Sequence, residues 1–317
     1  MVDVLVTEDV WGEPFQELAG QWDVRREPEL WSEPAALAKA ASEASALVVR
    51  NRTPVTAELL AACPKLKIVA RAGVGLDNIA LPAANDAGVV VAAPLGANAR
   101  SVAEHTLGAA LALARNTVPR DREARTGGWN RAAGTELHGK TWGLLGAGAT
   151  ARACGQLAAA IGMTVLAYDP YVDPESLGGI RLVSLDEVAD ASDVLSCHLP
   201  ATPETTGLVG REFLARMRPG SLFVNVGRGE VVDEEALADA LESGRPAGAA
   251  LDVRAQEPPA PGRLEQLPNT VLTPHIAGIT EQSQDRILRV LATDIDAVLR
   301  GAEARAMVGI ARKARAA

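Results

Sequence analysis

The sequence contains few cysteines, no long apolar run and a deficit of basic residues, and each shortage excludes a class of protein. Its three cysteines, Cys63, Cys154 and Cys197, show neither CxxC nor Cys/His spacing, so no disulfide framework or metal site is predicted. No apolar run approaches the roughly 18 residues of a membrane span, and the N-terminus does not resemble a signal peptide. These absences favour a protein of the reducing cytoplasm that has no membrane partner.

Acidic residues outnumber basic ones, and the net charge is −9. This is the wrong sign for a protein that binds by neutralising phosphate backbones, so a nucleic acid partner is not expected. The hydrophobic content of 48% and the charged content of 22% are those of an ordinary globular protein. At roughly 150 residues per domain, a chain of 317 residues is predicted to form two domains.

Short β-branched segments alternate with segments of helical periodicity along most of the chain. One series of strand-like segments ends near residue 92, and a second series begins at Thr141. This alternation is typical of βαβ units, so an α/β fold with two parallel sheets is predicted. A long helix is expected over residues 101–117, where Ser101 and Glu104 fit a capping box. Another is expected over 284–300, packed back on the first domain.

The strongest local signal is the sequence GLLGAGATA at residues 143–151, which follows a strand-like segment and opens a helix-like one. Gly146 permits a tight turn, and Gly148 lets the backbone approach a pyrophosphate at the helix N-terminus. Ala151 is the small third residue of this pattern. Because glycines at such turns can also serve packing alone, the motif is weak by itself.

Asp169 strengthens the evidence from the glycine motif, because it ends the next predicted strand, 21 positions after Gly148. A carboxylate there would hydrogen-bond a ribose diol and would repel the extra phosphate of NADP, so NAD is the predicted cofactor. The alternative is a solvated aspartate in the turn before Pro170. The register of strand, glycine loop, helix, strand and acid favours the cofactor site.

Three polar residues at predicted strand ends suit hydride transfer to a 2-oxo acid. Arg228 in FVNVGRGE could hold carboxylate and carbonyl oxygens with its planar guanidinium group. His275 in TPHIAG suits proton exchange, and Glu257, 18 residues earlier, could orient the imidazole. Each residue alone has a structural alternative, but parallel sheets bind ligands at their carboxyl ends.

The other three histidines differ in their sequence context. His105 lies within the first long predicted helix, and we interpret it and His138 as structural. His198 follows a strand of the second series, and we predict that it lines the nicotinamide site.

With these residues in place, the sequence resembles the D-isomer-specific 2-hydroxyacid dehydrogenase family, and within it the 3-phosphoglycerate dehydrogenase branch. The segments that carry the resemblance, in chain order, are VRNRTPVTAELLAACPKLKIVARAGVGLDNI, SVAEHTLGAALALAR, GTELHGKTWGLLGAGA, HLPATPET, NVGRGEVVDEEAL, ALDV, EPP and TPHIAG. The resemblance implies a flavodoxin-like substrate domain, residues 1–97 plus 286–317, and a Rossmann-like NAD domain, residues 98–285. It also implies an active site in the cleft between them and a homodimer built through the NAD domain.

The resemblance also implies roles for single residues. Arg228, Glu257 and His275 fall on the catalytic Arg, Glu and His of the family, and Asp252 falls on the acid that contacts the nicotinamide carboxamide. The remaining positions that the resemblance assigns to the cofactor are Ala149, Thr150, Pro200 and Val226.

The predicted substrate residues follow from the same resemblance. The amides of Val74 and Gly75 would hold the substrate carboxylate. Arg50 and Arg71 match basic positions that face the phosphate of 3-phosphoglycerate, and Arg131 matches one that reaches in from the partner subunit.

The sequence departs from the family pattern at several positions. The loop GAGATA lacks the arginine of the usual GxGRIG, Asn51 replaces a small hydroxyl residue, and Arg254 replaces an aromatic or apolar residue after ALDV. The loss of that loop arginine leaves weaker NAD affinity open. Because the chain ends soon after the last predicted helix, feedback control through a serine-sensing regulatory domain is not expected.

These observations predict an NAD-dependent oxidoreductase that acts on a small D-2-hydroxy acid or 2-oxo acid, with 3-phosphoglycerate or a phospho or phosphono analogue as first choice. The alternative substrates are hydroxypyruvate, glyoxylate and other short 2-oxo acids. A hypothesis of a different class is an NAD-sensing, non-catalytic binding protein of the corepressor type.

Overall fold

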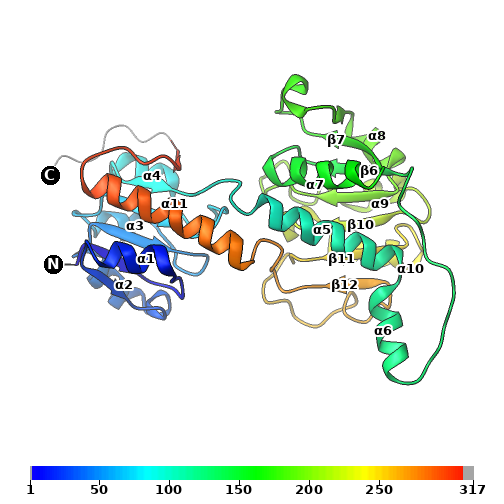
Figure 1. Cartoon of the computed structure of the whole chain (residues 1–317), viewed down its shortest axis with the longest axis horizontal. Coiled ribbons are helices and arrows are strands. Elements are labelled where there is room, and N and C mark those ends of the chain that lie inside the picture. The colour runs from blue at the N-terminus through cyan, green and yellow to red at the C-terminus, as the bar shows by residue number, and fades with distance from the viewer. Residues whose placement is uncertain (1, 310–317) are drawn as a thin grey trace. The chain divides into compact units, whose positions relative to one another are not determined.

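The computed structural model describes residues 2–309, and these form two compact units (Figure 1). One unit contains the chain up to Asn98 together with residues from Ile279 onward, and the other contains Ala99–Gly278. Each unit is a parallel-dominated sheet with helices on its faces, which confirms the predicted α/β class. Met1 and residues 310–317, which the prediction assigned to the substrate domain, lie outside the described residues.

The first unit contains a six-stranded sheet in the order β13-β5-β4-β3-β1-β2. Its five parallel strands have the order 2-1-3-4-5, which is flavodoxin-like as predicted. The two-residue β13 is the only strand of this sheet that pairs antiparallel. The strand bounds are β1 Val4–Val6, β2 Val24–Arg26, β3 Ala46–Val49, β4 Ile68–Arg71, β5 Val90–Ala92 and β13 Met307–Val308.

Helices cover both faces of this sheet, because successive strand residues point to opposite sides. Val4 and Val6 belong to one apolar core and Leu5 to the other. The helices are α1 Glu13–Ala19, α2 Pro34–Ala41, α3 Ala57–Ala61, α4 Leu81–Asp86 and α11 Glu281–Leu299, with a 3₁₀ turn, η1, at Leu30–Ser32. Apolar residues of α11, among them Leu291 and Ile295, lie in the same core as Val4. The prediction that this helix packs back on the first domain is therefore confirmed.

The second unit contains a seven-stranded, fully parallel sheet in the order β12-β11-β10-β9-β6-β7-β8. Counted from β6, the order is 3-2-1-4-5-6-7, which is the doubly wound Rossmann order with one further strand. The strand bounds are β6 Thr141–Leu145, β7 Thr164–Tyr168, β8 Arg181–Leu182, β9 Val194–Cys197, β10 Leu222–Asn225, β11 Gly248–Leu251 and β12 Thr270–Leu272.

Two further apolar cores lie on the faces of this second sheet. The helices are α5 Ala99–Ala114, α6 Thr117–Arg125, α7 Ala149–Ala160, α8 Leu185–Ala191, α9 Arg211–Arg216 and α10 Glu234–Glu242, with 3₁₀ turns η2 Pro174–Leu177 and η3 Gly229–Val231. The predicted cap at Ser101 is wrong, since α5 begins at Ala99 and Ser101 is buried in its first turn. No described helix is both long and apolar enough to cross a membrane.

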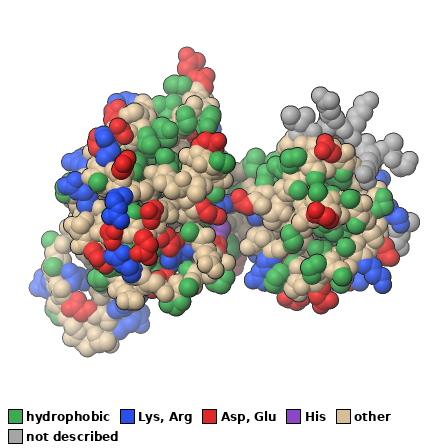
Figure 2. Space-filling view, turned by 180° about the vertical axis from the view of Figure 1, so that it is seen from behind, with side chains coloured by type: hydrophobic (Ala, Val, Ile, Leu, Met, Phe, Trp, Pro, Cys, Tyr) green, Lys and Arg blue, Asp and Glu red, His purple; other side chains and the backbone are tan. Residues whose placement is uncertain are grey.

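One segment of the second unit has almost no buried residues. Helix α6 has no buried residue, and the following residues, 126–136, are exposed except for Gly128. Figure 1 shows α6 and this segment projecting from the sheet, and Figure 2 shows basic side chains along the same projection. We call residues 117–136 the arm.

Candidate active site

The predicted functional residues of the second unit follow the carboxyl ends of its strands. Arg228 follows β10, Glu257 lies in the loop after β11, and His275 comes three residues after β12. The glycine loop follows β6, and Asp169 follows β7. Because all these strands are parallel, their carboxyl ends meet at one edge of the sheet, where such folds bind ligands.

Glu257 and His275 form a hydrogen-bonded pair at this edge. The Nδ1 atom of His275 lies 2.8 Å from Oε2 of Glu257. This contact fixes the orientation of the ring and leaves Nε2 as the nitrogen that can exchange a proton with a ligand.

The loop that carries His275 is held by Asp252, which is buried. One oxygen of its carboxylate accepts hydrogen bonds from the Thr273 hydroxyl at 2.5 Å and from the Ile276 amide at 2.9 Å, and the other accepts from the Ala277 amide at 2.8 Å. His275 itself has a left-handed φ of 55°, which is costly for a non-glycine residue. The three bonds to Asp252 stabilise this conformation.

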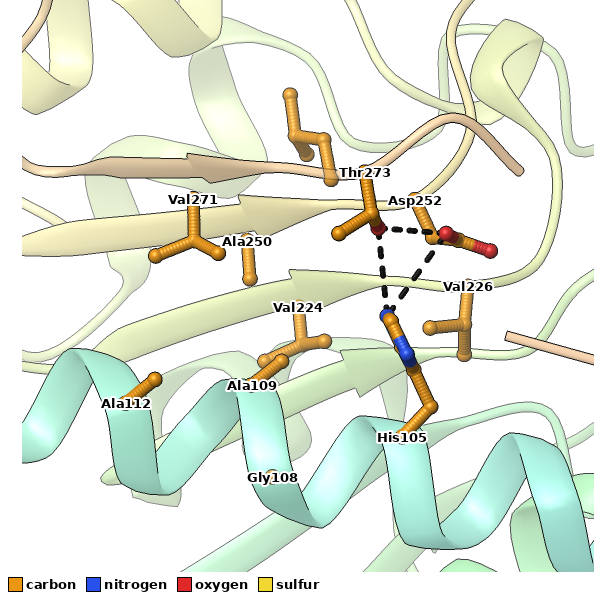
Figure 3. A pocket seen from close by; sticks show the side chains of 11 residues that line it. His105, Gly108, Ala109, Ala112, Val224, Val226, Ala250, Asp252, Val271 and Thr273 are labelled. Carbon is orange, nitrogen blue, oxygen red and sulfur yellow. Dashed lines mark hydrogen bonds and ion pairs between the residues drawn. The ribbon is translucent and has the colours of Figure 1, made fainter. Parts of the chain in front are cut away.

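A cavity of about 260 Å³ lies between α5 and strands β10 to β12 (Figure 3). Its polar end is formed by His105, Asp252 and Thr273, with His105 Nε2 3.3 Å from the Thr273 hydroxyl and 3.7 Å from Asp252. His105 therefore contacts Asp252, the residue that holds the His275 loop. Its position inside an ordinary helical pattern gave no sign of this contact.

Two glycines flank Arg228 and let neighbouring loops approach it. A Cβ atom on Gly227 would lie 2.6 Å from the Leu199 carbonyl oxygen, and one on Gly229 would lie 1.9 Å from the Arg254 carbonyl carbon. The Asn225 side chain also spans this turn, donating to the Arg228 carbonyl at 3.0 Å and accepting from the Gly227 amide at 3.1 Å. The loops after β9, β10 and β11 are thus in direct backbone contact.

The glycine loop has the geometry that the sequence predicts. Gly146 has a φ of 89°, and Gly148 is the N-cap of α7 with open space where a Cβ would lie. Asp169 ties this loop to the end of β7, because its carboxylate accepts from the Ala147 amide at 2.9 Å and from the Tyr171 amide at 2.9 Å. An open helix N-terminus beside a carboxylate fits the pyrophosphate and ribose of a dinucleotide.

His198 is held in its neutral form. Burial lowers the pKa of this imidazole to about 3. Its Nε2 atom pairs with the Ser196 hydroxyl at 3.0 Å, and that hydroxyl also accepts from the Trp142 indole at 2.8 Å. Nδ1 is buried and has no hydrogen-bond partner among residues 2–309. A neutral ring with one unpaired buried nitrogen fits the lining of a cofactor site.

The predicted substrate residues of the first unit lie together. Arg50 follows β3, Arg71 ends the adjacent β4, and Val74 and Gly75 lie in the loop after it. Arg71 is only 9% exposed. A Cβ on Gly73 would lie 1.6 Å from its guanidinium, so this group packs against the backbone of the loop. Arg50 is half-buried, and Arg131 lies exposed on the arm of the second unit.

Sequence reasoning missed Glu8, a buried acid two residues after the end of β1. Its carboxylate accepts hydrogen bonds from four successive backbone amides, those of residues 50–53, at 2.7 to 3.2 Å. The Asn78 side chain donates to the Arg50 and Thr53 carbonyls at 3.1 and 2.7 Å. The only sequence signal is an acid shortly after an apolar strand.

The family model that matches this chain and the relatives that are similar to it agree with each other. Residues 107–277 match the family model described as the NAD binding domain of D-isomer specific 2-hydroxyacid dehydrogenases. A D-3-phosphoglycerate dehydrogenase of Mycobacterium tuberculosis is 46% identical over 269 residues, which are 84% of this chain and 51% of that protein. The chain thus spans about half the length of the curated relatives it matches.

Solved structures match over nearly the whole chain. The TT0316 protein from Thermus thermophilus superposes with a TM-score of 0.90 at 34% identity, covering 97% of this chain and 100% of that one. D-Lactate dehydrogenase from Aquifex aeolicus, solved with NAD and lactic acid, gives a TM-score of 0.84 at 29% identity over 94% and 96% of the two chains.

Proposed function

The chain belongs to the D-isomer specific 2-hydroxyacid dehydrogenase family, and on that premise we propose that it is an NAD-dependent oxidoreductase acting on a small D-2-hydroxy acid or 2-oxo acid. The observation that carries this proposal is the Glu257–His275 hydrogen bond at the carboxyl edge of the second sheet. The loop that carries Glu257 contacts the backbone next to Arg228 through residues 254 and 255. An acid-base group and a guanidinium for the substrate carboxylate therefore belong to the same edge of the sheet.

In the proposed reaction, each polar residue has one task. The guanidinium of Arg228 binds the carboxylate and carbonyl oxygens of a 2-oxo acid. Protonated His275 donates from Nε2 to the carbonyl oxygen during reduction and takes the proton back during oxidation. Glu257 orients the ring through its hydrogen bond to Nδ1. The nicotinamide, when bound, supplies or accepts the hydride.

The residues proposed to hold NAD lie at the strand ends of the second unit. The amides at the start of α7, where Ala149 and Thr150 follow Gly148, would face the pyrophosphate, and Asp169 would accept from the ribose hydroxyls. A carboxylate oxygen has several acceptor sites, so the bond to the Ala147 amide leaves capacity for a ribose hydroxyl. The remaining proposed cofactor contacts are His198, Pro200, Val226 and Asp252.

We propose 3-phosphoglycerate, or an analogue with a second anionic group, as the substrate. Support comes from the 46% identity to a protein named D-3-phosphoglycerate dehydrogenase. Arg50 and Arg71 at adjacent strand ends would read the second anion, Val74 and Gly75 the carboxylate, and Arg131 would come from a partner subunit. One observation favours the alternative of a short unphosphorylated 2-oxo acid, namely that the Arg71 guanidinium is packed against Gly73.

We further propose a homodimer formed through the second unit. The arm has no buried helix residue, and Trp129 on it is 84% exposed. Tryptophan is enriched at protein interfaces, so an exposed Trp129 on this segment supports the proposal. Sedimentation of the wild-type chain and of Trp129→Ser tests this, because the variant is expected to shift the population toward monomer.

The cytoplasm is the proposed location of this reaction. All three cysteines are buried as free thiols. Unpaired thiols are typical of a reducing compartment, so this supports the proposal.

An NADH-oxidation screen over phosphorylated and unphosphorylated 2-oxo acids tests the function directly. We expect turnover with at least one of them. His275→Gln should lower that turnover by about a hundredfold or more, the scale of losing general acid-base help, while NADH binding persists. His138→Gln, at an exposed histidine, is the matched control. NAD binding without turnover on any acid would contradict the proposal and favour a non-catalytic NAD-sensing protein.

A further inference from the structure

Arg254 forms a nearly buried charge network in the loop after β11. Its side chain is only 9% exposed. Nε and Nη2 donate to the two oxygens of Glu234 at 3.0 and 2.8 Å, a two-pronged contact, and Nη1 donates to Glu265. Glu234 is the first residue of α10, whose N-cap Asp233 accepts from the Ala236 amide at 3.0 Å. The network therefore ties the loop to a capped helix.

The same network leads directly to the acid-base pair. The Ala255 amide donates to Oε1 of Glu234 at 2.9 Å. Glu234 therefore binds both the Arg254 side chain and the backbone of the loop. The Arg254 amide donates to Oε1 of Glu257 at 3.1 Å, and the other oxygen of Glu257 contacts His275 at 2.8 Å. An unbroken chain of contacts thus runs from α10 to the imidazole.

The anchored segment also touches the loop that carries Arg228. A Cβ on Gly229 would lie 1.9 Å from the Arg254 carbonyl carbon and 2.2 Å from the Ala255 nitrogen. Residues 254 and 255 therefore pack directly on the backbone next to Arg228. A shift of this segment would disturb both the proposed acid-base pair and the proposed substrate clamp.

We propose that Arg254, held by Glu234 and Glu265, is a positioning residue that orients Glu257 toward His275. The inference rests on the proposed function, because it assumes that His275 exchanges the proton. Arginine suits this position, since its rigid fork holds two carboxylates while its own amide holds a third. An apolar residue here would leave the loop fastened by fewer contacts.

Arg263 provides a matched control. It also joins this loop to α10, through ion pairs to Glu235, Asp239 and Glu242 at 2.9 to 3.0 Å, but it is more exposed. Among the interactions of the described residues, none joins its side chain to residues 254–257. If losing any contact between the loop and α10 were enough to lower activity, Arg263→Met and Arg254→Met would lower it alike. If Arg254 acts by positioning Glu257, only Arg254→Met would lower it.

The experiment compares Arg254→Met, Arg254→Lys and Arg263→Met with the wild type. We expect Arg254→Met to lower kcat about tenfold, a fraction of the hundredfold or more expected for losing the acid-base group itself, with KM for NADH nearly unchanged. Lysine cannot form the fork, so Arg254→Lys should restore little. Arg263→Met should match the wild type.

A readout without activity separates this inference from the proposed function. The NMR signal of the proton on His275 Nδ1, which the hydrogen bond to Glu257 protects from exchange with water, should be broadened in Arg254→Met relative to the wild type. If the wild type turns over no acid, the proposed function fails while this signal still decides the positioning role. If Arg254→Met does not fold, Glu234→Gln, which keeps the side-chain volume, should show the same changes. An unchanged Nδ1 proton signal together with an unchanged kcat, or equal losses in Arg263→Met, would overturn the inference.

Discussion

The carboxylate of Glu8 lies 2.7 Å from the backbone amide of Arg50, the residue proposed to read the second anion of the substrate. The same carboxylate accepts from the amides of the next three residues, so the acid that follows β1 sets the shape of the whole loop after β3. The loop therefore does not depend on a substrate for its conformation. Such preorganisation lowers the entropic cost of binding.

Replacing Glu8 should destabilise the first unit. In Glu8→Gln, the new amide group points hydrogen-bond donors at backbone donors, and buried amides lose their partners. We expect a loss of about 1 to 3 kcal/mol in the free energy of unfolding, measured with urea. Exposed Glu17→Gln serves as control. A free energy of unfolding equal to that of the wild type would show that the four hydrogen bonds contribute little.

Arg50→Ala should separate the two substrate hypotheses. If Arg50 binds the second anion, KM for phosphorylated or phosphonylated 2-oxo acids should rise much more than KM for glyoxylate or pyruvate. The penalty falls mainly on KM when the contact is equally strong in the ground and transition states. Steady-state kinetics over the substrate panel measure it. A uniform loss across all acids would favour the unphosphorylated alternative.

The parts of this site that could be predicted depend on short motifs in the sequence, whereas the parts that could not depend on contacts between residues far apart in the chain. The glycine loop, Asp169, Arg228 and His275 each follow a strand of the parallel sheet, where a short motif and the rule for parallel sheets place them. The flavodoxin-like and Rossmann-like sheet orders followed from the family resemblance and are confirmed. Short edge strands such as β2, β8 and β13 carried no comparable pattern, because half-exposed strands of two or three residues have little periodicity.

The supporting contacts could not be predicted from the sequence. Glu8 meets residues more than 40 positions away, and Arg254 meets Glu234 across 20 positions. The substitution at Arg254 was visible as a departure from the family, yet its meaning depends on where α10 begins. The predicted cap at Ser101 failed for a related reason, because a matching pair of residues does not fix the start of a helix whose first turn is buried.

Asp169 should govern the choice between NAD and NADP. Asp169→Asn keeps one oxygen that can accept from the Ala147 amide and loses the acceptor for the Tyr171 amide, so the tie to the glycine loop can persist while the negative charge is lost. We expect the ratio of kcat/KM for NADH to that for NADPH to fall, since the repulsion of the 2′-phosphate disappears. Kinetics with both cofactors measure the ratio. An unchanged preference would assign the selectivity to another residue.

His198 should make the stability of the protein depend on pH below neutrality. Because burial lowers the pKa of His198 to about 3 in the folded chain, the folded state stays unprotonated while the unfolded chain binds a proton below about pH 6.5. The unfolded state then binds more protons, so stability is complete above that pH and is lost as the pH falls toward 3. The slope approaches about 1.4 kcal/mol per pH unit.

Comparing wild type with His198→Gln isolates this contribution, because other titrating groups are common to both proteins. Between pH 7 and pH 5, the wild type should lose about 2 kcal/mol more of its free energy of unfolding in urea than the variant does. His138→Gln, at an exposed histidine, serves as the control substitution. Parallel pH dependences in wild type and His198→Gln would mean that His198 takes up a proton in the folded protein as readily as in the unfolded one. A neutral His198 would then no longer support its proposed place beside the nicotinamide.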